Sequence, residues 1–414
     1  MLKFSCNQNH FFMSTLLQPL SASNRDRNLD ILRGFALAGV LFMFCVSDNG
    51  PSYGYTNSLL DEVIAWPKYL LIENRMYVML ILIFGIGFHV QLEKAKQNNT
   101  SIVPVFTRRI FGLLILGFIH AVLISSRDIL MFYGAAGFFL LLIRNLSSRQ
   151  LLIVIGIVFA IMISGIVYIL FGNAWPQMNS LVEPNNYPDY AQYNWQFFKV
   201  YHQMYGIYIE MLFHFLLGFW ISKAGILKKI NENKKLRRRL LIISLVVAAI
   251  LIPFYFFILD DLYPVIRKAL AVKWLIYSVS LIFRILWYVL TTACVTLYAT
   301  ILISLSRSGK GKWFLPLASF GQMALSNYLI QSLVLVPYFL LTNKFRTVAP
   351  TEGLILFIVV FALQLVFSTW WMARYTMGPF EWLLRSFTYW KRQTIKKTSK
   401  EELRRLRLTT AAML

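Results

Sequence analysis

The chain has 414 residues, of which 58% are hydrophobic and 14% charged, and its mean hydropathy is +0.59. A soluble two-domain protein does not have this composition, so we expect a polytopic membrane protein. The net charge of +23 does not indicate a nucleic-acid partner, because no basic and aromatic binding motif accompanies it. Lys and Arg instead concentrate in the short segments between apolar runs, which follows the positive-inside rule and favours contact with anionic membrane lipids.

Runs of roughly 20 apolar residues, the length that crosses a bilayer as a helix, recur along the chain. The sequence predicts an all-α fold of ten transmembrane helices with both termini in the cytoplasm. This count puts every strongly basic segment on the cytoplasmic side. The predicted spans are about 29–47, 68–92, a third that ends near 124, 129–143, a fifth that ends near 171, 202–222, 240–259, 274–305, 315–341 and 354–372.

The eighth span is long and contains Arg284, so we expect it to tilt or break. The aromatic segment 172–199 has few basic residues and is predicted to be an external loop that lies partly in the membrane interface. The predicted organisation is a cytoplasmic tail 1–27, a membrane region 28–222 with six spans, a basic cytoplasmic loop 223–239, a membrane region 240–390 with four spans, and a basic cytoplasmic tail 391–414.

The segment from Arg108 to Gly137 predicts two apolar helices joined by a polar corner, with His120 near the end of the first and Asp128 at the start of the second. Ionisable residues are costly inside a membrane and usually mark a functional site. At 1.5 Å per residue, His120 lies about 24 Å along its helix and level with Asp128. His120 is therefore a candidate general base whose tautomer Asp128 fixes, and the alternative is a histidine hydrogen-bonded for packing.

Asp30 and Arg33 are three residues apart and share a face at the inner end of the first span. They predict either a structural ion pair or a site where Arg33, with Arg108 or Arg109, binds the phosphates of a nucleotide-bearing donor, because a guanidinium group matches phosphate in a bidentate fork.

Two further polar groups have similar alternatives. Glu73 and Arg75 lie at the outer end of the second span and could line an acceptor pocket or form a rim salt bridge. Ser326, Asn327 and Gln331 form a polar stripe, which predicts interhelical hydrogen bonds or a substrate cavity. Cys6, Cys45 and Cys294 and the histidines show no ligand spacing, so we expect no metal site.

Several short motifs resemble the YeiB-like family of bacterial inner-membrane proteins, the domain-of-unknown-function family numbered 418, and the resemblance covers nearly the whole chain from Asn28. Gln322 departs from the family pattern, where Arg is usual. The matching motifs are Asn28 to Gly34, Glu73 with Arg75, Phe84 to Phe88, Arg108-Arg109, Gly117, His120, Asp128 to Leu130 with Tyr133, Gly321, Met323 to Leu325, Asn327-Tyr328, Gln331-Ser332, and Gly378-Pro379 with Glu381-Trp382 and Arg385.

This family in turn looks like transmembrane acyltransferases. The resemblance implies a multi-pass protein of the bacterial inner membrane that moves an acyl group from cytoplasmic acyl-CoA, as a co-substrate and not a bound cofactor, to a glycan or lipid-linked acceptor on the other face. The alternative, from another class, is a small-solute transporter or exporter that uses the same polar groups as a permeation path.

Overall fold

A computed structural model describes residues 26–46, 58–126, 128–172, 184, 186–203, 205–257, 273–308, 311–344 and 348–397. The predicted N-terminal tail, Arg127 at the polar corner and the basic tail beyond Lys397 lie outside these residues. Within them the chain is helical, and its one β feature is an isolated bridge between Tyr375 and Lys396. The all-α prediction is therefore confirmed.

The N-terminal half of the described chain supplies α2 (Arg27–Cys45), α3 (Leu59–Pro67), η3 (Lys68–Ile72), α4 (Arg75–Gln97), α5 (Val103–Ile119), η4 (His120–Ile124), α6 (Leu130–Leu142), α7 (Ser148–Gly172), α8 (Tyr187–Gln203) and α9 (Tyr205–Lys223). The C-terminal half supplies α10 (Ile226–Glu232), α11 (Lys234–Phe257), α13 (Lys273–Arg307), η6 (Gly311–Phe314), α14 (Leu315–Gln322), α15 (Ala324–Leu341), α16 (Pro350–Arg374) and α17 (Pro379–Tyr389).

Among the described residues, eight helices are long and apolar enough to cross a membrane, and the number is nine if the bent pair α9 and α10 forms one span. Helix α6, with 13 residues, is a shorter apolar helix. The structure thus confirms a multi-pass helical fold, while the exact number of crossings and the sidedness of the termini stay predictions.

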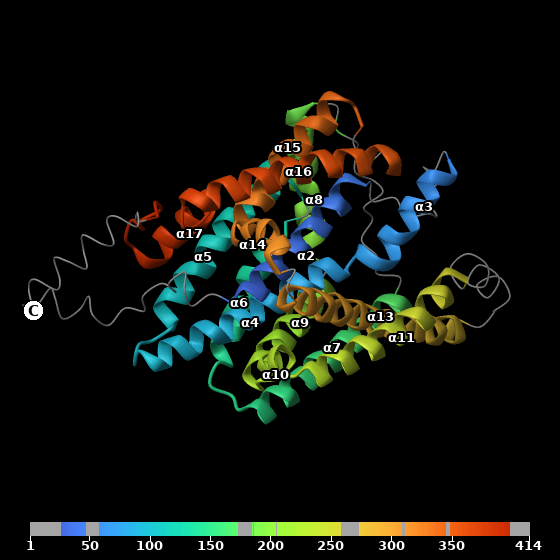
Figure 1. Cartoon of the computed structure of the whole chain (residues 1–414). Coiled ribbons are helices and arrows are strands. Elements are labelled where there is room, and N and C mark those ends of the chain that lie inside the picture. The colour runs from blue at the N-terminus through green and yellow to red at the C-terminus, as the bar shows by residue number, and fades with distance from the viewer. Residues whose placement is uncertain are drawn as a thin grey trace, which may run out of the picture.

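Helix α2 lies at the centre of the bundle, where it packs against α4, α14, α15 and α16 (Figure 1). Two glycines allow its close contact with α14. A Cβ atom on Gly34 would lie 2.2 Å from the Leu317 carbonyl oxygen, and one on Gly321 would lie 2.0 Å from the Asp30 carbonyl oxygen. The N-terminal part of α2 and the helix α14 are therefore fixed to each other through their backbones.

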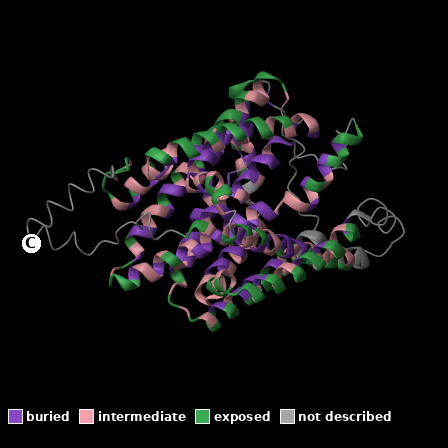
Figure 2. Ribbon diagram, viewed as in Figure 1, coloured by how far each residue is buried: buried purple, intermediate pink, exposed green. Residues whose placement is uncertain are grey.

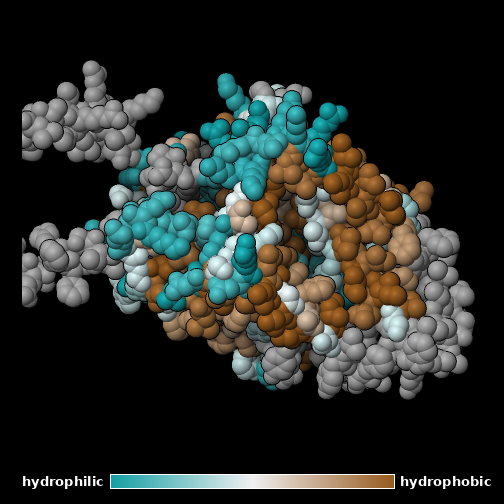
Figure 3. Space-filling model, turned by 90° about the horizontal axis from the view of Figure 1, so that it is seen from below, coloured by the Kyte–Doolittle hydropathy of each residue, from teal (hydrophilic) through white to brown (hydrophobic). Residues whose placement is uncertain are grey.

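The outer helices present apolar side chains to their surroundings. Buried residues gather on the inner helices, whereas α7, α11 and α16 have long exposed stretches (Figure 2). Ile153 on α7, Val246 on α11 and Val366 on α16 are each at least half exposed. Seen from below, hydrophobic residues cover the right-hand part of the surface and hydrophilic residues gather on the left (Figure 3). An exposed surface of this kind fits contact with lipid.

Several predicted boundaries differ from the structure. The second span begins with the π-helical turn η3 and restarts as α4 after Asn74, which has a φ of 64°. The ninth span is two helices, α14 and α15, that meet at Met323. The eighth span does not break, because α13 is one continuous helix of 35 residues. The segment 172–199, predicted to be an external loop, is partly helical, since Tyr187–Gln203 forms the helix α8.

Candidate active site

The predicted hairpin is present as α5, η4 and α6, and its two helices pack side by side. Gly117 allows this approach, because a Cβ atom there would lie 2.7 Å from both the Asp128 Oδ2 atom and the Met131 amide nitrogen. At its end α5 widens into the π-helical turn η4, closed by a 2.7 Å hydrogen bond from the Ser125 amide to the His120 carbonyl oxygen. Such π-helical turns occur often at functional sites.

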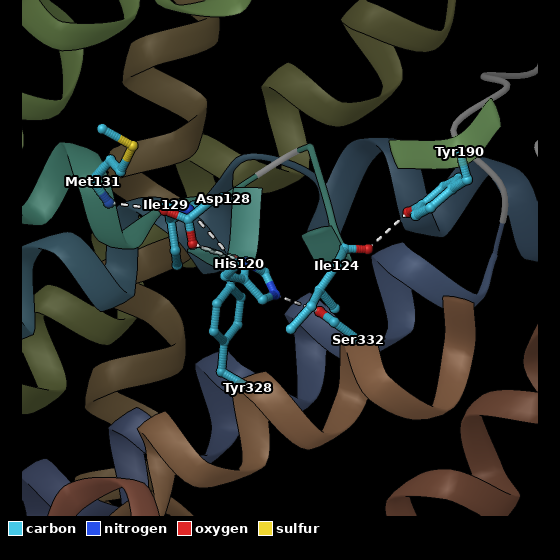
Figure 4. Close-up of polar contacts among 8 residues, drawn as sticks. All are labelled: His120, Ile124, Asp128, Ile129, Met131, Tyr190, Tyr328 and Ser332. Atoms are coloured by element: carbon cyan, nitrogen blue, oxygen red, sulfur yellow. Dashed lines mark hydrogen bonds and ion pairs between the residues drawn. The ribbon is translucent and has the colours of Figure 1, made fainter. Parts of the chain in front are cut away.

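The His120 imidazole lies between an acid and a hydroxyl group (Figure 4). Its Nδ1 atom is 3.0 Å from Asp128 Oδ1, and its Nε2 atom is 2.9 Å from the Ser332 Oγ atom on α15. His120 and Asp128 are each only 1% exposed. If Nδ1–H donates to the Asp128 carboxylate, Nε2 can accept a hydrogen bond from the Ser332 hydroxyl group. The network therefore favours the tautomer that carries its proton on Nδ1.

Asp128 is itself held by the start of α6 and by α15. Its Oδ2 atom accepts a 2.8 Å hydrogen bond from the Met131 amide, and the Tyr328 hydroxyl lies 3.5 Å from its Oδ1 atom. The same hydroxyl accepts a 3.3 Å hydrogen bond from the Ile129 amide. Asp128 thus caps the helix that follows it while it orients the imidazole.

Helix α8 holds the turn that carries His120. The Tyr187 hydroxyl donates a 2.9 Å hydrogen bond to the Leu123 carbonyl oxygen, and the Tyr190 hydroxyl donates one of the same length to the Ile124 carbonyl oxygen (Figure 4). These carbonyl groups end a helix and would otherwise lack a partner, which is costly away from water. The aromatic segment predicted to be a loop therefore contributes directly to the site.

The sequence indicated Ser332 only as part of a family motif, and its position beside His120 was not predicted. It is 212 residues from His120 along the chain. The available signal was its spacing of four residues from Tyr328, which puts both polar side chains on one face of α15.

Ser332 also lines a cavity of about 430 Å³ between η4, the start of α8 and the C-terminal half of α15. The other lining side chains are mostly apolar, among them Leu123, Val336 and Leu340. The hydroxyl group that contacts His120 therefore lies at the edge of an apolar space.

The predicted donor-binding residues lie around the basic ends of α2 and α5. Arg33 Nη1 is 2.9 Å from Asp30 Oδ1, so the predicted pair is formed, and the Arg33 side chain is 32% exposed. Arg108 donates to the Thr388 carbonyl oxygen and Arg109 to Gln91 Oε1, each at 3.2 Å. Arg109 is within electrostatic range of Arg33, whereas Arg108 points to α17.

The predicted acceptor residues do not line the cavity at Ser332. Arg75 is fully buried, stacks over Trp287 at 3.8 Å and donates at 2.7 Å to the main-chain oxygen of Glu73. Asn327 donates to Ser368 at 2.9 Å, and Gln331 donates to Gln364 at 3.2 Å. The contacts of Asn327 and Gln331 match the interhelical hydrogen bonds predicted as the alternative for that polar stripe. An acceptor-binding role for Glu73, Arg75, Asn327 and Gln331 stays a prediction.

Glu381, on α17, fixes the start of α15. Its carboxylate accepts hydrogen bonds from the Leu325 amide at 2.6 Å, the Ser326 amide at 3.1 Å and the Ser326 hydroxyl at 2.5 Å. Desolvation raises the pKa of Glu381, while the hydrogen bonds from Ser326 oppose that change. The carboxylate thus caps the helix that carries Ser332.

Comparison with known proteins relates this chain to uncharacterised bacterial proteins. Residues 221–391 match the family described as "Protein of unknown function (DUF418)". This part of the chain is similar to that family and is called the DUF418 region after it. The chain is also homologous to two uncharacterised bacterial proteins, YxaH of Bacillus subtilis (29% identical, over 93% of this chain and 99% of YxaH) and YeiB of Escherichia coli (24% identical, over 88% of this chain and 96% of YeiB). No solved structure matches the chain.

The DUF418 region contains Tyr328 and Ser332 but not His120 or Asp128. The candidate site is therefore assembled from both halves of the chain. The homologous proteins are uncharacterised, so the function has to be argued from the site itself.

Proposed function

We propose that the protein is a transmembrane acyltransferase of the bacterial inner membrane. It would move an acyl group from cytoplasmic acyl-CoA to the hydroxyl or amine of an extracytoplasmic glycan or lipid-linked acceptor. The observation that carries the proposal is the buried His120 imidazole, which has Asp128 on Nδ1 and a hydroxyl group on Nε2. This is the arrangement of a general base and its orienting carboxylate in acyl transfer.

In this reaction His120 Nε2 accepts the proton of the attacking hydroxyl or amine group. The new bond to the acyl carbon forms as the bond from that carbon to the CoA sulfur breaks. The proton then passes from the imidazolium to the departing thiolate, so that free CoA is released. Asp128 stabilises the imidazolium between these two transfers, because a carboxylate on Nδ1 favours the charged ring.

Arginines supply a site for the donor phosphates at the basic end of the bundle. Arg33 is partly exposed there, and Arg109 lies within electrostatic range of both Arg33 and Arg385. The buried Nε atom of Arg109 has no hydrogen-bond partner among the described residues. A phosphate group would supply the missing acceptor and offset the repulsion between these cations.

The transporter alternative predicts helices broken at mid-membrane. Among the described helices, the bent pair Gly206–Lys223 and Ile226–Glu232 has an angle of 60°, and Gly225, with a φ of 70°, lies at the bend. Lys223, Lys228 and Lys229 flank Gly225 in the sequence, so this break belongs to the predicted basic loop.

The test is the release of free CoA thiol by the purified full chain in detergent, with acetyl-CoA, octanoyl-CoA and palmitoyl-CoA as donors and bacterial envelope lipids as acceptor. His120→Gln should lower the rate by about two to four powers of ten, the usual contribution of a general base. His89→Gln is the matched control. His89 also contacts a serine hydroxyl group, that of Ser222, but it lies on α4, away from the candidate site. Equal rates for wild type and His120→Gln would overturn the assignment of the base, and absence of acceptor-dependent thiol release with all three donors would overturn the reaction.

A further inference from the structure

The cavity beside Ser332 has the properties of an acyl-chain site. It has a volume of about 430 Å³, within the usual range of ligand pockets, and Leu123, Ile124, Leu333, Val336 and Leu340 give it an apolar lining. The Ser332 side chain lies at its edge and is the residue that also contacts His120. An alkyl chain in this space would place its carbonyl end at a hydroxyl group and a base.

The contacts of Ser332 are those of an activated nucleophile. A serine hydroxyl attacks an acyl carbon only when a base removes its proton, and the base must be held in the correct tautomer. Ser332 Oγ is 2.9 Å from His120 Nε2, and His120 Nδ1 is 3.0 Å from Asp128 Oδ1. Both distances are within the range expected for a working nucleophile, base and orienting acid.

We propose that Ser332 is the nucleophile that carries the acyl group as an ester, and that the apolar cavity binds an acyl chain longer than acetyl. This inference rests on the proposed acyl-transfer function and adds to it a covalent intermediate and a substrate class. The sequence predicted that His120 takes the proton of the acceptor directly. In the structure Ser332 lies on the His120 Nε2 atom, between the base and the apolar cavity.

The reaction then has two balanced halves. In the first, Ser332 Oγ bonds to the acyl carbonyl carbon, its proton moves to His120 Nε2, and the donor's leaving group departs with that proton, as free CoA from a thioester. In the second, the acceptor hydroxyl or amine attacks the serine ester, its proton moves to His120 Nε2, and the proton is returned to Ser332 Oγ as the acylated acceptor leaves. Neither half consumes an oxidant or a reductant.

The acyl carbonyl can come from a CoA thioester or from a membrane lipid ester, and the experiment separates these sources. The full chain in detergent, without acceptor, is incubated either with octanoyl-CoA or with CoA-free phospholipid that carries isotope-labelled acyl chains. Acid-quenched protein is then measured by intact mass, and the modified peptide is sequenced. We expect an acyl adduct on Ser332 of the wild type with octanoyl-CoA. A labelled adduct only in the phospholipid arm would keep the nucleophile and overturn acyl-CoA as the donor.

Variants of the serine test the nucleophile itself. Ser332→Ala should give no adduct, and Ser332→Cys should restore one as a thioester that neutral hydroxylamine removes. Ser164→Ala is the matched control and should keep the adduct, because Ser164 is an exposed helical serine whose hydroxyl donates to the Ala160 carbonyl oxygen in its own helix. An adduct on another residue, or none in either donor arm from a folded protein, would overturn the proposal.

A pair of valines on α15 tests the cavity. Val336→Trp fills the space and should lower octanoyl labelling at least about tenfold, with little effect on acetyl labelling. Val334→Trp is the control, since Val334 is 44% exposed and is not among the lining residues. Equal octanoyl labelling in the two variants would overturn the chain-binding role.

The outcomes separate this inference from the proposed function. Thiol release that needs an acceptor and proceeds at the wild-type rate in Ser332→Ala would overturn the serine intermediate and leave His120 as the base of a direct transfer. Absence of both thiol release and adducts would overturn both.

Discussion

His120 has one defined partner on each ring nitrogen, and together these partners favour the tautomer that carries its proton on Nδ1. Asp128 on Nδ1 and Ser332 on Nε2 are both almost completely buried. In this buried environment water cannot replace a lost hydrogen-bond partner. A change in either contact therefore alters the tautomer of His120 as well as the stability of the site. The Asp128 carboxylate has the further task of capping α6 through Met131.

Asp128→Asn tests the tautomer. An asparagine amide can donate to Nδ1, which would put the imidazole proton on Nε2 and leave that atom unable to accept a proton from a hydroxyl group. We expect kcat for acceptor-dependent thiol release to fall by about two to four powers of ten with little change in KM. Steady-state kinetics on the purified chain measure both constants.

Asp61→Asn is the matched control, because Asp61 is another buried carboxylate that accepts a main-chain hydrogen bond, from Thr351 at 3.0 Å. This variant should keep the wild-type kcat. An Asp128→Asn protein that is folded and has the same kcat as Asp61→Asn would show that the carboxylate does not orient the base.

At the scale of the helices, the hairpin of α5, η4 and α6 determines the position of the base. The π-helical turn starts at His120, and α8 holds that turn through the hydroxyl groups of Tyr187 and Tyr190. The approach of α6 depends on the missing side chain of Gly117. The contact between His120 and Asp128 is therefore sensitive to packing in the helix that precedes it.

Gly117→Ala should separate the two side chains. Alanine normally favours a helix over glycine by about 1 kcal/mol, but here its Cβ atom would collide with Asp128 and Met131, and overpacking of this kind costs about 1–3 kcal/mol. We expect a lower melting temperature and at least about tenfold slower acyl transfer.

The control for this change is Gly156→Ala in α7, where an added Cβ atom has nothing within 4 Å. Gly156→Ala should be as stable as wild type or slightly more stable, and fully active. If Gly117→Ala behaves in the same way, the close contact between α5 and α6 is not needed for the site.

The helices also show what the sequence could predict. Apolar periodicity and the polar corner were enough to predict the α5–α6 hairpin and to pair His120 with Asp128, because both are local signals. Ser332 was not predicted, since its contact with His120 depends on how α15 packs against a turn more than 200 residues earlier. Helix α8 was missed because its polar and aromatic composition resembles that of an interfacial loop, and its role appears only when its tyrosines meet the carbonyl groups of η4.

At the scale of the whole molecule, the proposed reaction connects two separate places. Arg108, beside the donor arginines, and His120 are twelve residues apart on one helix, which corresponds to about 18 Å. The donor phosphates and the reacting carbon must span this distance at the same time. Long, flexible donors such as acyl-CoA thioesters suit that requirement better than compact ones.

Arg33→Ala tests the donor end. Titration calorimetry of the folded protein with octanoyl-CoA should show weaker binding by at least about tenfold, because a charged hydrogen bond to phosphate contributes about 1.5–3 kcal/mol. Arg149→Ala, which removes an exposed arginine at the start of α7, should bind as wild type does. Equal affinities for wild type and Arg33→Ala would remove Arg33 from the donor site.

The direct backbone contact between Gly34 on α2 and Gly321 on α14 has a consequence for how such proteins can change. The DUF418 region begins after α9 has almost ended, yet α14 packs against α2 and α17 against α5. A chimera that takes residues 221–391 from a homologous protein would have to reproduce these surfaces, and also present its serine to a histidine inherited from the other parent. The contacting surfaces of the two halves should therefore change together. A screen of chimeras should recover working proteins only when α2 and α14 come from the same parent protein.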